Sequence, residues 1–161
     1  MASPDFAGLS VLIAESKPQM ADLLGQMLRG IGVRNIQIAN DAVAASALLR
    51  RGGIDVLMID DALTGLNGTT FTRRLRRLDD EEARQVAVIM MSSQPSAASI
   101  ALARDAGITE FLRRPFSAAV IREKLTAIAA APRPFIDNET YAGPDRRRRS
   151  AKPSAGERRA S

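Results

Sequence analysis

The segment Val56-Leu57-Met58-Ile59-Asp60-Asp61 places four consecutive apolar residues directly before two carboxylates. A continuous apolar run of this length is typical of a central parallel strand that helices cover on both faces. Polar residues at the carboxyl end of such a strand lie where open α/β sheets place their binding sites. The stretch therefore predicts a buried strand that delivers Asp60 and Asp61 to a functional crevice.

On both sides of this segment, short apolar runs alternate with stretches of helical periodicity. The expected strands lie near residues 11–14, 35–39, 56–59, 86–91 and 110–112, and the last expected helix spans Ala118 to Ala130. Strands that alternate with helices in this way pair in parallel, and right-handed crossovers limit the possible topologies. The pattern predicts an α/β fold: a doubly wound, five-stranded parallel sheet with strand order 2-1-3-4-5.

Polar residues follow several of these strands, where the carboxyl ends of parallel strands meet at one edge of the sheet. We expect one pocket that combines carboxylates, hydroxyls and a guanidinium. Its predicted residues are Glu15, Ser16, Asp60, Asp61, Ser92 and Arg114.

The composition excludes several kinds of chemistry. The chain has no cysteine and no histidine, which excludes disulfides, thiolate or imidazole metal sites and Ser-His-Asp catalysis. We expect a protein that is not an enzyme. Its start does not resemble a signal peptide, and no apolar run reaches the ~18 residues of a membrane span, so we expect a cytoplasmic protein without membrane insertion.

The positive charge is concentrated at the C-terminus. Residues 1–130 carry a net charge of +1 and residues 131–161 carry +4, out of +5 for the chain. The latter segment holds four of the eight prolines and few apolar side chains, a composition typical of disorder. We therefore expect a domain over 1–130 and a disordered, arginine-rich, ligand-binding tail over 131–161. The arginines at 73, 74, 76 and 77 are expected to form a solvated helix face.

The tail repeats the order glycine, acid, arginine, arginine, once around Asp145 and once around Glu157. A carboxylate weakens attraction to phosphate, but it can accept hydrogen bonds from the Watson–Crick edge of guanine. A guanidinium can pair with guanine O6 and N7, and a second guanidinium or a tyrosine ring can stack on the base. Two such clusters predict a ligand with two guanines and two phosphates, namely cyclic di-GMP. The predicted contacts are Tyr141, Asp145, Arg146, Arg147, Arg148, Arg149, Glu157, Arg158 and Arg159.

Other interpretations of the tail stay open. Four consecutive arginines would contact the phosphates of a nucleic acid regardless of its sequence. The tail could also be merely a solvated basic segment. Tyr141 could instead be a hydrophobic anchor that packs the tail against the domain.

Residues 9–130 resemble the response-regulator receiver (CheY-like) domain in element order, spacing and the Arg114-Pro115-Phe116 turn. The resemblance implies that Asp60 is the phospho-acceptor position, that Ser92 reads the phosphorylated state, and that Phe111 is the switch aromatic.

The sequence departs from the receiver pattern at two positions. Glu15-Ser16 stands where the family has two acidic residues that hold Mg²⁺, and Arg114 stands where it has lysine. Weak Mg²⁺ binding at Glu15 and Asp60 is the most that we expect, because a ligand charge is missing. Arg114 could form a bidentate pair with Asp60, which would leave the phospho-acceptor position vestigial.

The degenerate receiver and the stretch Tyr141 to Arg149 together resemble the Cle family of CheY-like cyclic-di-GMP effectors. This resemblance implies that the tail binds cyclic di-GMP, and that the receiver docks on the flagellar motor switch protein to tune motility or surface attachment. A phosphorylation-dependent single-domain response regulator and a nucleic-acid-binding protein are the alternatives.

Overall fold

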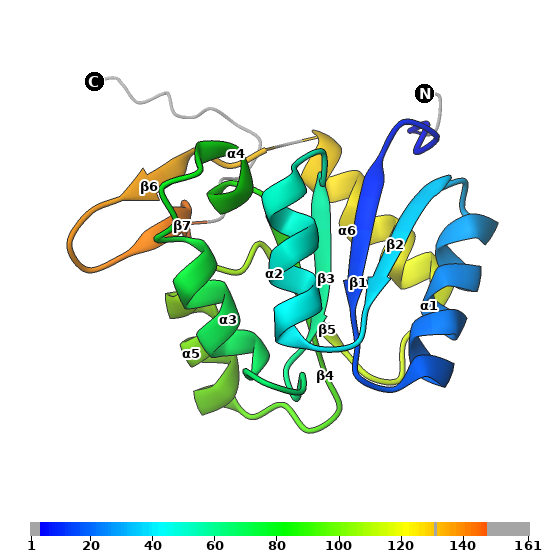
Figure 1. Cartoon of the computed structure of the whole chain (residues 1–161), viewed down its shortest axis with the longest axis horizontal. Coiled ribbons are helices and arrows are strands. Elements are labelled where there is room, and N and C mark those ends of the chain that lie inside the picture. The colour runs from blue at the N-terminus through cyan, green and yellow to red at the C-terminus, as the bar shows by residue number, and fades with distance from the viewer. Residues whose placement is uncertain (1–3, 131, 148–161) are drawn as a thin grey trace, which may run out of the picture.

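The computed structural model describes residues 4–130 and 132–147. Five parallel strands form one sheet in the order β2-β1-β3-β4-β5 (Figure 1), which confirms the predicted topology. The strands are β1 (Ser10–Ala14), β2 (Asn35–Ala39), β3 (Val56–Asp60), β4 (Ala87–Ser92) and β5 (Glu110–Arg113). β3 lies at the centre, and its apolar residues Val56 to Ile59 are at most 1% exposed, as the continuous apolar run predicts.

Helices cover both faces of the sheet (Figure 1). Side chains of β1 alternate between two cores: Leu12 and Ala14 belong to one cluster, Val11 and Ile13 to the other. The first cluster includes residues of α2 (Ala42–Arg51), α3 (Gly68–Leu75) and α5 (Ala97–Ala106). The second includes residues of α1 (Pro18–Gly30) and α6 (Ala118–Ala130). The short helix α4 (Glu81–Arg84) follows α3.

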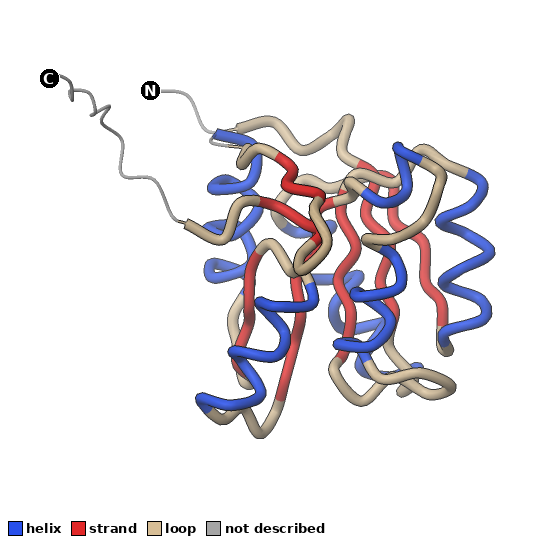
Figure 2. Tube along the Cα trace, turned by 90° about the vertical axis from the view of Figure 1, so that its left-hand side faces the viewer, coloured by secondary structure: helices blue, strands red, loops and turns tan. Residues whose placement is uncertain are grey.

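The C-terminal segment differs from the prediction. Residues 132–147 are ordered against the domain, and they contain an antiparallel hairpin of β6 (Phe135–Asp137) and β7 (Ala142–Pro144). In Figure 2 the hairpin faces the viewer, and Arg84 of α4 holds it through an ion pair with Asp137 at 2.9 Å. The disorder expected from residue 131 is therefore wrong for residues 132–147, which pack against the domain.

The hairpin is ordered because it uses the surface of a domain that is already folded. Tyr141 is buried, at 4% exposure, and so are Ala142 and the residues that follow it up to Asp145. A Cβ added to Gly107, at the end of α5, would lie 2.6 Å from the carbonyl oxygen of Ala142. Composition predicts whether a segment can form a hydrophobic core by itself. This segment does not need one, because its side chains pack on the core of the folded domain.

Arg76 also differs from the expected solvated arginine face. It is 1% exposed, whereas Arg73, Arg74 and Arg77 are exposed. Its guanidinium donates to the carbonyl oxygens of Gly107 at 2.8 Å and of Arg84 and Val86, each at 2.6 Å. Burial lowers the pKa of Arg76 to about 10. Through these hydrogen bonds, Arg76 connects the end of α3 to the end of α4 and to the end of α5.

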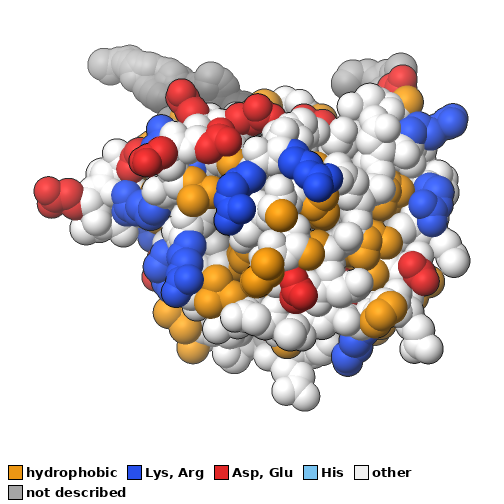
Figure 3. All heavy atoms as spheres, in the orientation of Figure 1, with side chains coloured by type: hydrophobic (Ala, Val, Ile, Leu, Met, Phe, Trp, Pro, Cys, Tyr) orange, Lys and Arg blue, Asp and Glu red, His pale blue; other side chains and the backbone are white. Residues whose placement is uncertain are grey.

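On the face drawn in Figure 3, basic side chains lie over α2 and α3, and acidic side chains gather around α4. The last turns of α2 and α3 carry the arginines, and the first turn of α4 carries Glu81 and Glu82. Within residues 4–130 and 132–147, no helix is long and apolar enough to cross a membrane.

Candidate functional site

A crevice of about 470 Å³ opens at the carboxyl ends of the central strands. Five of the six predicted pocket residues line it, namely Glu15, Ser16, Asp60, Asp61 and Arg114. The sixth, Ser92, ends β4 and is only 1% exposed, while its neighbour Ser93 lines the crevice. The strand ends therefore meet as predicted.

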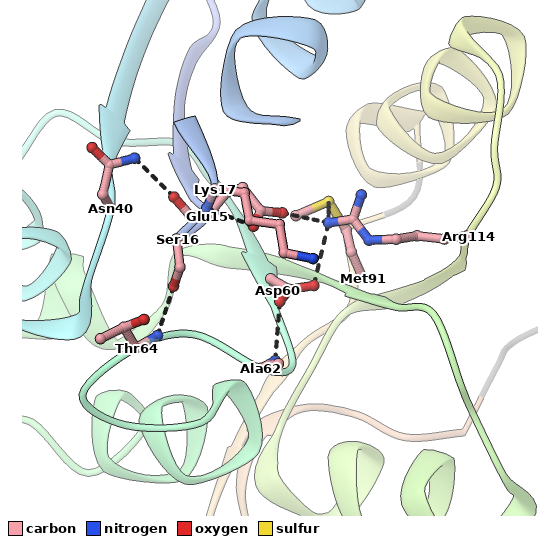
Figure 4. Close-up of polar contacts among 9 residues, drawn as sticks. All are labelled: Glu15, Ser16, Lys17, Asn40, Asp60, Ala62, Thr64, Met91 and Arg114. Atoms are coloured by element: carbon pink, nitrogen blue, oxygen red, sulfur yellow. Dashed lines mark hydrogen bonds and ion pairs between the residues drawn. The ribbon is translucent and has the colours of Figure 1, made fainter. Parts of the chain in front are cut away.

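Arg114 bridges the two carboxylates at the base of this crevice (Figure 4). Its Nη2 atom donates to Glu15 Oε1 at 2.6 Å and to Asp60 Oδ1 at 3.2 Å. The three side chains are between 3% and 13% exposed. The predicted contact between Arg114 and Asp60 is confirmed. Its geometry is not the predicted bidentate pair, because one nitrogen of Arg114 donates to both carboxylates.

The other oxygens of these carboxylates accept backbone hydrogen bonds. Glu15 Oε2 accepts from the amide of Lys17 at 3.1 Å, and Asp60 Oδ2 accepts from the amide of Ala62 at 3.1 Å. Thus all four carboxylate oxygens are engaged, which is how buried carboxylates remain stable as anions.

Ser16 and Ser92 have different environments. Ser16 Oγ accepts from the amide of Thr64 at 2.7 Å, so this hydroxyl fixes the loop after β3 (Figure 4). Ser92 Oγ is buried and has no hydrogen-bond partner among the described residues. The carbonyl oxygen of Ser92 accepts from the amide of Arg114 at 2.8 Å, so the two residues are neighbours across strands.

The residues present do not fit a bound Mg²⁺ ion. Mg²⁺ requires an octahedral set of oxygen ligands, but the guanidinium of Arg114 lies between the carboxylates that would supply them. In the described part of the chain, no three acidic side chains are grouped to hold a metal ion. The arginine thus supplies the positive charge that a divalent cation would otherwise bring.

Phe111 lies in β5, three residues before Arg114. It is half-buried and packs against the core cluster that includes Leu57 and Val88. Its exposed side lines a second cavity, away from the crevice, beside the C-terminal hairpin.

Two of the predicted ligand contacts in the tail face the domain. The Tyr141 hydroxyl donates to the carbonyl oxygen of Pro144 at 2.6 Å, and burial raises the pKa of this phenol. Asp145 is 5% exposed and accepts from the backbone and side chain of Arg147 at 3.0 to 3.2 Å. Tyr141 thus has the anchoring role that is the alternative interpretation of this residue. Asp145 accepts hydrogen bonds from Arg147 of the same segment.

The arginines that follow are accessible. Arg146 forms an ion pair with Asp105 at 2.6 Å and lies over the Tyr141 ring at 4.3 Å, with its side chain 49% exposed. The side chain of Arg147 is 80% exposed. The predicted contacts Arg148, Arg149, Glu157, Arg158 and Arg159 lie outside the described residues.

Arg133 is a further residue of this region that the sequence analysis does not single out, because composition places it in a disordered tail. Its guanidinium donates to the carbonyl oxygens of Thr109 and Asp145, and it approaches Glu110 to 3.9 Å. The signal was the pair of prolines that flank it, since Pro132 and Pro134 restrict the backbone and lower the entropic cost of ordering.

Comparisons with known proteins agree with the fold described above. The model of the response regulator receiver domain matches residues 11–126. The chain is 29% identical over 120 residues to chemotaxis protein CheY-3 of Vibrio cholerae, covering 74% of this chain and 91% of that protein. It is 28% identical over 120 residues to chemotaxis protein CheY of Pseudomonas aeruginosa, covering 74% and 95%.

Solved structures show the same fold. The receiver domain of a sensor histidine kinase from Pseudomonas aeruginosa, which has a magnesium ion in its active-site cleft, aligns with a TM-score of 0.66 at 27% identity, covering 74% of this chain and 95% of that one. Chemotaxis response regulator CheY4 of Vibrio cholerae aligns with a TM-score of 0.68 at 18% identity, covering 74% and 98%. The strand order, the aspartate at the end of β3 and the matched residues 11–126 together establish that this chain belongs to the response regulator receiver domain family.

Proposed function

We propose that this chain is a receiver-type signalling adaptor that responds to cyclic di-GMP bound by its C-terminal arginines, and not to phosphorylation of Asp60. The observation that carries the second half of the proposal is the Arg114 bridge between Glu15 and Asp60. Phosphoryl transfer requires an accessible acceptor and a metal ion that neutralises the developing charge. Here an arginine holds the acceptor, so Mg²⁺ binding is weak and Asp60 is vestigial as an acceptor.

The position of the arginines supports the first half. The hairpin is docked by Tyr141, and the side chains of Arg146 and Arg147, at the end of the described residues, are 49% and 80% exposed. Arginine guanidinium groups pair with guanine and with phosphate. The four consecutive arginines from Arg146 to Arg149, which follow the docked hairpin, therefore suit a ligand that carries both groups. In this proposal Tyr141 and Asp145 position the segment, and the arginines from Arg146 onward contact the ligand together with the second cluster around Glu157.

The same proposal names a protein partner. The resemblance to the Cle family implies the flagellar motor switch protein as this partner, and the chemotaxis proteins among the relatives support a role in motility. The chain would act in the cytoplasm at the flagellar base, without catalysis, by changing a protein contact that tunes motility or surface attachment.

Calorimetry on the full-length chain tests the proposal with cyclic di-GMP, GTP and a short DNA duplex. We expect the tightest binding for cyclic di-GMP, and Arg147→Ala should lose about 1–3 kcal/mol of it if a bidentate guanine contact is removed. Arg73→Ala, an exposed arginine of α3, is the control and should bind as the wild type does. Equal or tighter binding of the duplex would favour a nucleic-acid-binding protein instead.

Labelling with acetyl phosphate tests the receiver half separately. We expect no Mg²⁺-dependent label at Asp60, and unchanged partner binding in Asp60→Asn. Rapid labelling that Asp60→Asn abolishes would establish the phosphorylation-dependent alternative.

A further inference from the structure

A polar cavity of about 250 Å³ lies beside the edge strand β5, where the residues that flank the hairpin meet the domain. Four cationic side chains line it, each from a different segment: Arg104 of α5, Lys124 of α6, Arg133 before β6, and Arg146 after β7. None of them lines the crevice around Asp60. The cavity is therefore a second site, which exists because the hairpin is docked.

Buried Glu110 organises the floor of this cavity. Its carboxylate lies 3.4 Å from Lys124 Nζ and 3.9 Å from Arg133 Nη2. On the rim, Asp105 forms the ion pair with Arg146. The lining thus holds four cationic side chains and one carboxylate, Glu110, and Asp105 lies beside it; this excess of positive charge favours an anion.

Arg146 adds a surface that is suited to a flat ring. One face of its guanidinium lies over the Tyr141 ring, with the ring centroid at 4.3 Å, and half of the side chain is exposed. A nucleobase can stack on the outer face of a guanidinium held in this way. A base platform beside a cationic cavity fits a nucleotide better than it fits an acidic peptide, which offers no base.

We propose that this cavity binds a phosphate group of a nucleotide, which in the function proposed above is one phosphodiester of cyclic di-GMP. The receiver domain then supplies half of the ligand site through Arg104 and Lys124, and the hairpin supplies the other half through Arg133 and Arg146. Phe111 lines the same cavity, so a bound ligand touches the position at which receivers carry their switch aromatic.

The test is calorimetry of the full-length chain with cyclic di-GMP and, separately, with inorganic pyrophosphate. Arg104→Ala and Lys124→Ala should each weaken cyclic di-GMP binding about tenfold or more, because each removes a charge-assisted phosphate contact. Arg122→Ala is the matched control: it lies on α6, is exposed and does not line the cavity.

The outcomes separate this inference from the proposed function. Wild-type affinity in both Arg104→Ala and Lys124→Ala would overturn the cavity as a phosphate site, while cyclic-di-GMP binding by the wild type would still support the proposed function. If the wild type does not bind cyclic di-GMP, the proposed function fails and pyrophosphate decides the inference. Binding of pyrophosphate that both variants lose would support a phosphate site, and no pyrophosphate binding would overturn it.

Discussion

Replacing Arg114 with alanine would leave two carboxylates facing each other at the ends of β1 and β3. Glu15 is 3% exposed and Asp60 is 13% exposed at the side chain, and Arg114 is the cation that both contact. Removing one partner of a buried ion pair costs about 3–5 kcal/mol because the remaining charge stays buried. The crevice admits solvent, so we expect the lower end, about 3 kcal/mol, which lowers the melting temperature by roughly 6–12 °C for a chain of this size.

Thermal unfolding monitored by circular dichroism measures this loss, with and without Mg²⁺. Magnesium should stabilise Arg114→Ala, by about 1.4 kcal/mol at ten times its dissociation constant, since it can occupy the space between the carboxylates. It should leave the wild type unchanged. Arg114→Lys retains one positive charge without the planar fork, so its stability should lie between those of the wild type and Arg114→Ala.

Arg113→Ala serves as the control, because Arg113 is the exposed neighbour of Arg114 at the end of β5. Equal stability of Arg114→Ala and Arg113→Ala would show that Arg114 does not hold the two carboxylates. Equal stabilisation of the wild type and of Arg114→Ala by Mg²⁺ would show that the guanidinium does not occupy the cation position.

Two further predictions concern the docked hairpin. Tyr141 is the only tyrosine and there is no tryptophan, so phenolate absorbance reports this side chain alone; its pKa should be higher in the folded chain than in denaturant, where it is near 10.0. The folded state then binds the phenol proton more tightly than the unfolded state does. The contribution of Tyr141 to stability is therefore complete below pH 10 and is lost as the pH rises through the folded pKa. Equal titration midpoints in the folded and the denatured chain would contradict the burial of the phenol. Gly107→Ala should displace the hairpin, because the new Cβ would lie 2.6 Å from the Ala142 carbonyl oxygen, and should return the phenol to an ordinary titration. Gly32→Ala is the control, because Gly32 has a similar positive φ with nothing near its Cβ. It should cost only about 1–2 kcal/mol of strain and keep the raised phenol pKa. If the Tyr141 pKa also falls to its value in denaturant in this variant, loss of stability, and not the contact with Ala142, releases the hairpin.

The sheet and its crevice could be predicted because local pattern and global topology agree. The apolar run Val56 to Ile59 requires burial on both faces, and parallel strands then bring Glu15, Asp60 and Arg114 to one edge. The pairing of Arg114 with Asp60 was also predictable from charge. The bridge to Glu15 was not, since it depends on the depth to which one guanidinium nitrogen reaches.

The hairpin and Arg76 could not be predicted from composition. A buried arginine without a carboxylate partner is rare, and Arg76 is accommodated by three carbonyl oxygens that come together only in the folded chain. The hairpin depends on Gly107, where the absence of a side chain admits Ala142. Both features rest on contacts between segments that are distant in sequence, which no local pattern reports.

The two sites lie at opposite ends of β5, a strand of only four residues from Glu110 to Arg113. Glu110 begins the strand at the cationic cavity, and Arg114 follows its end at the crevice. β5 is an edge strand that pairs only with β4 among the described strands, so a shift along it meets less resistance than a shift of a central strand would. A ligand that fixes Glu110 and Phe111 therefore acts on the same element that carries Arg114, and any partner that senses this edge must in turn change the affinity for the ligand. In the function proposed above, Arg114 fixes the crevice end of β5 with an internal cation, and the ligand acts on the other end of the strand, at the cavity.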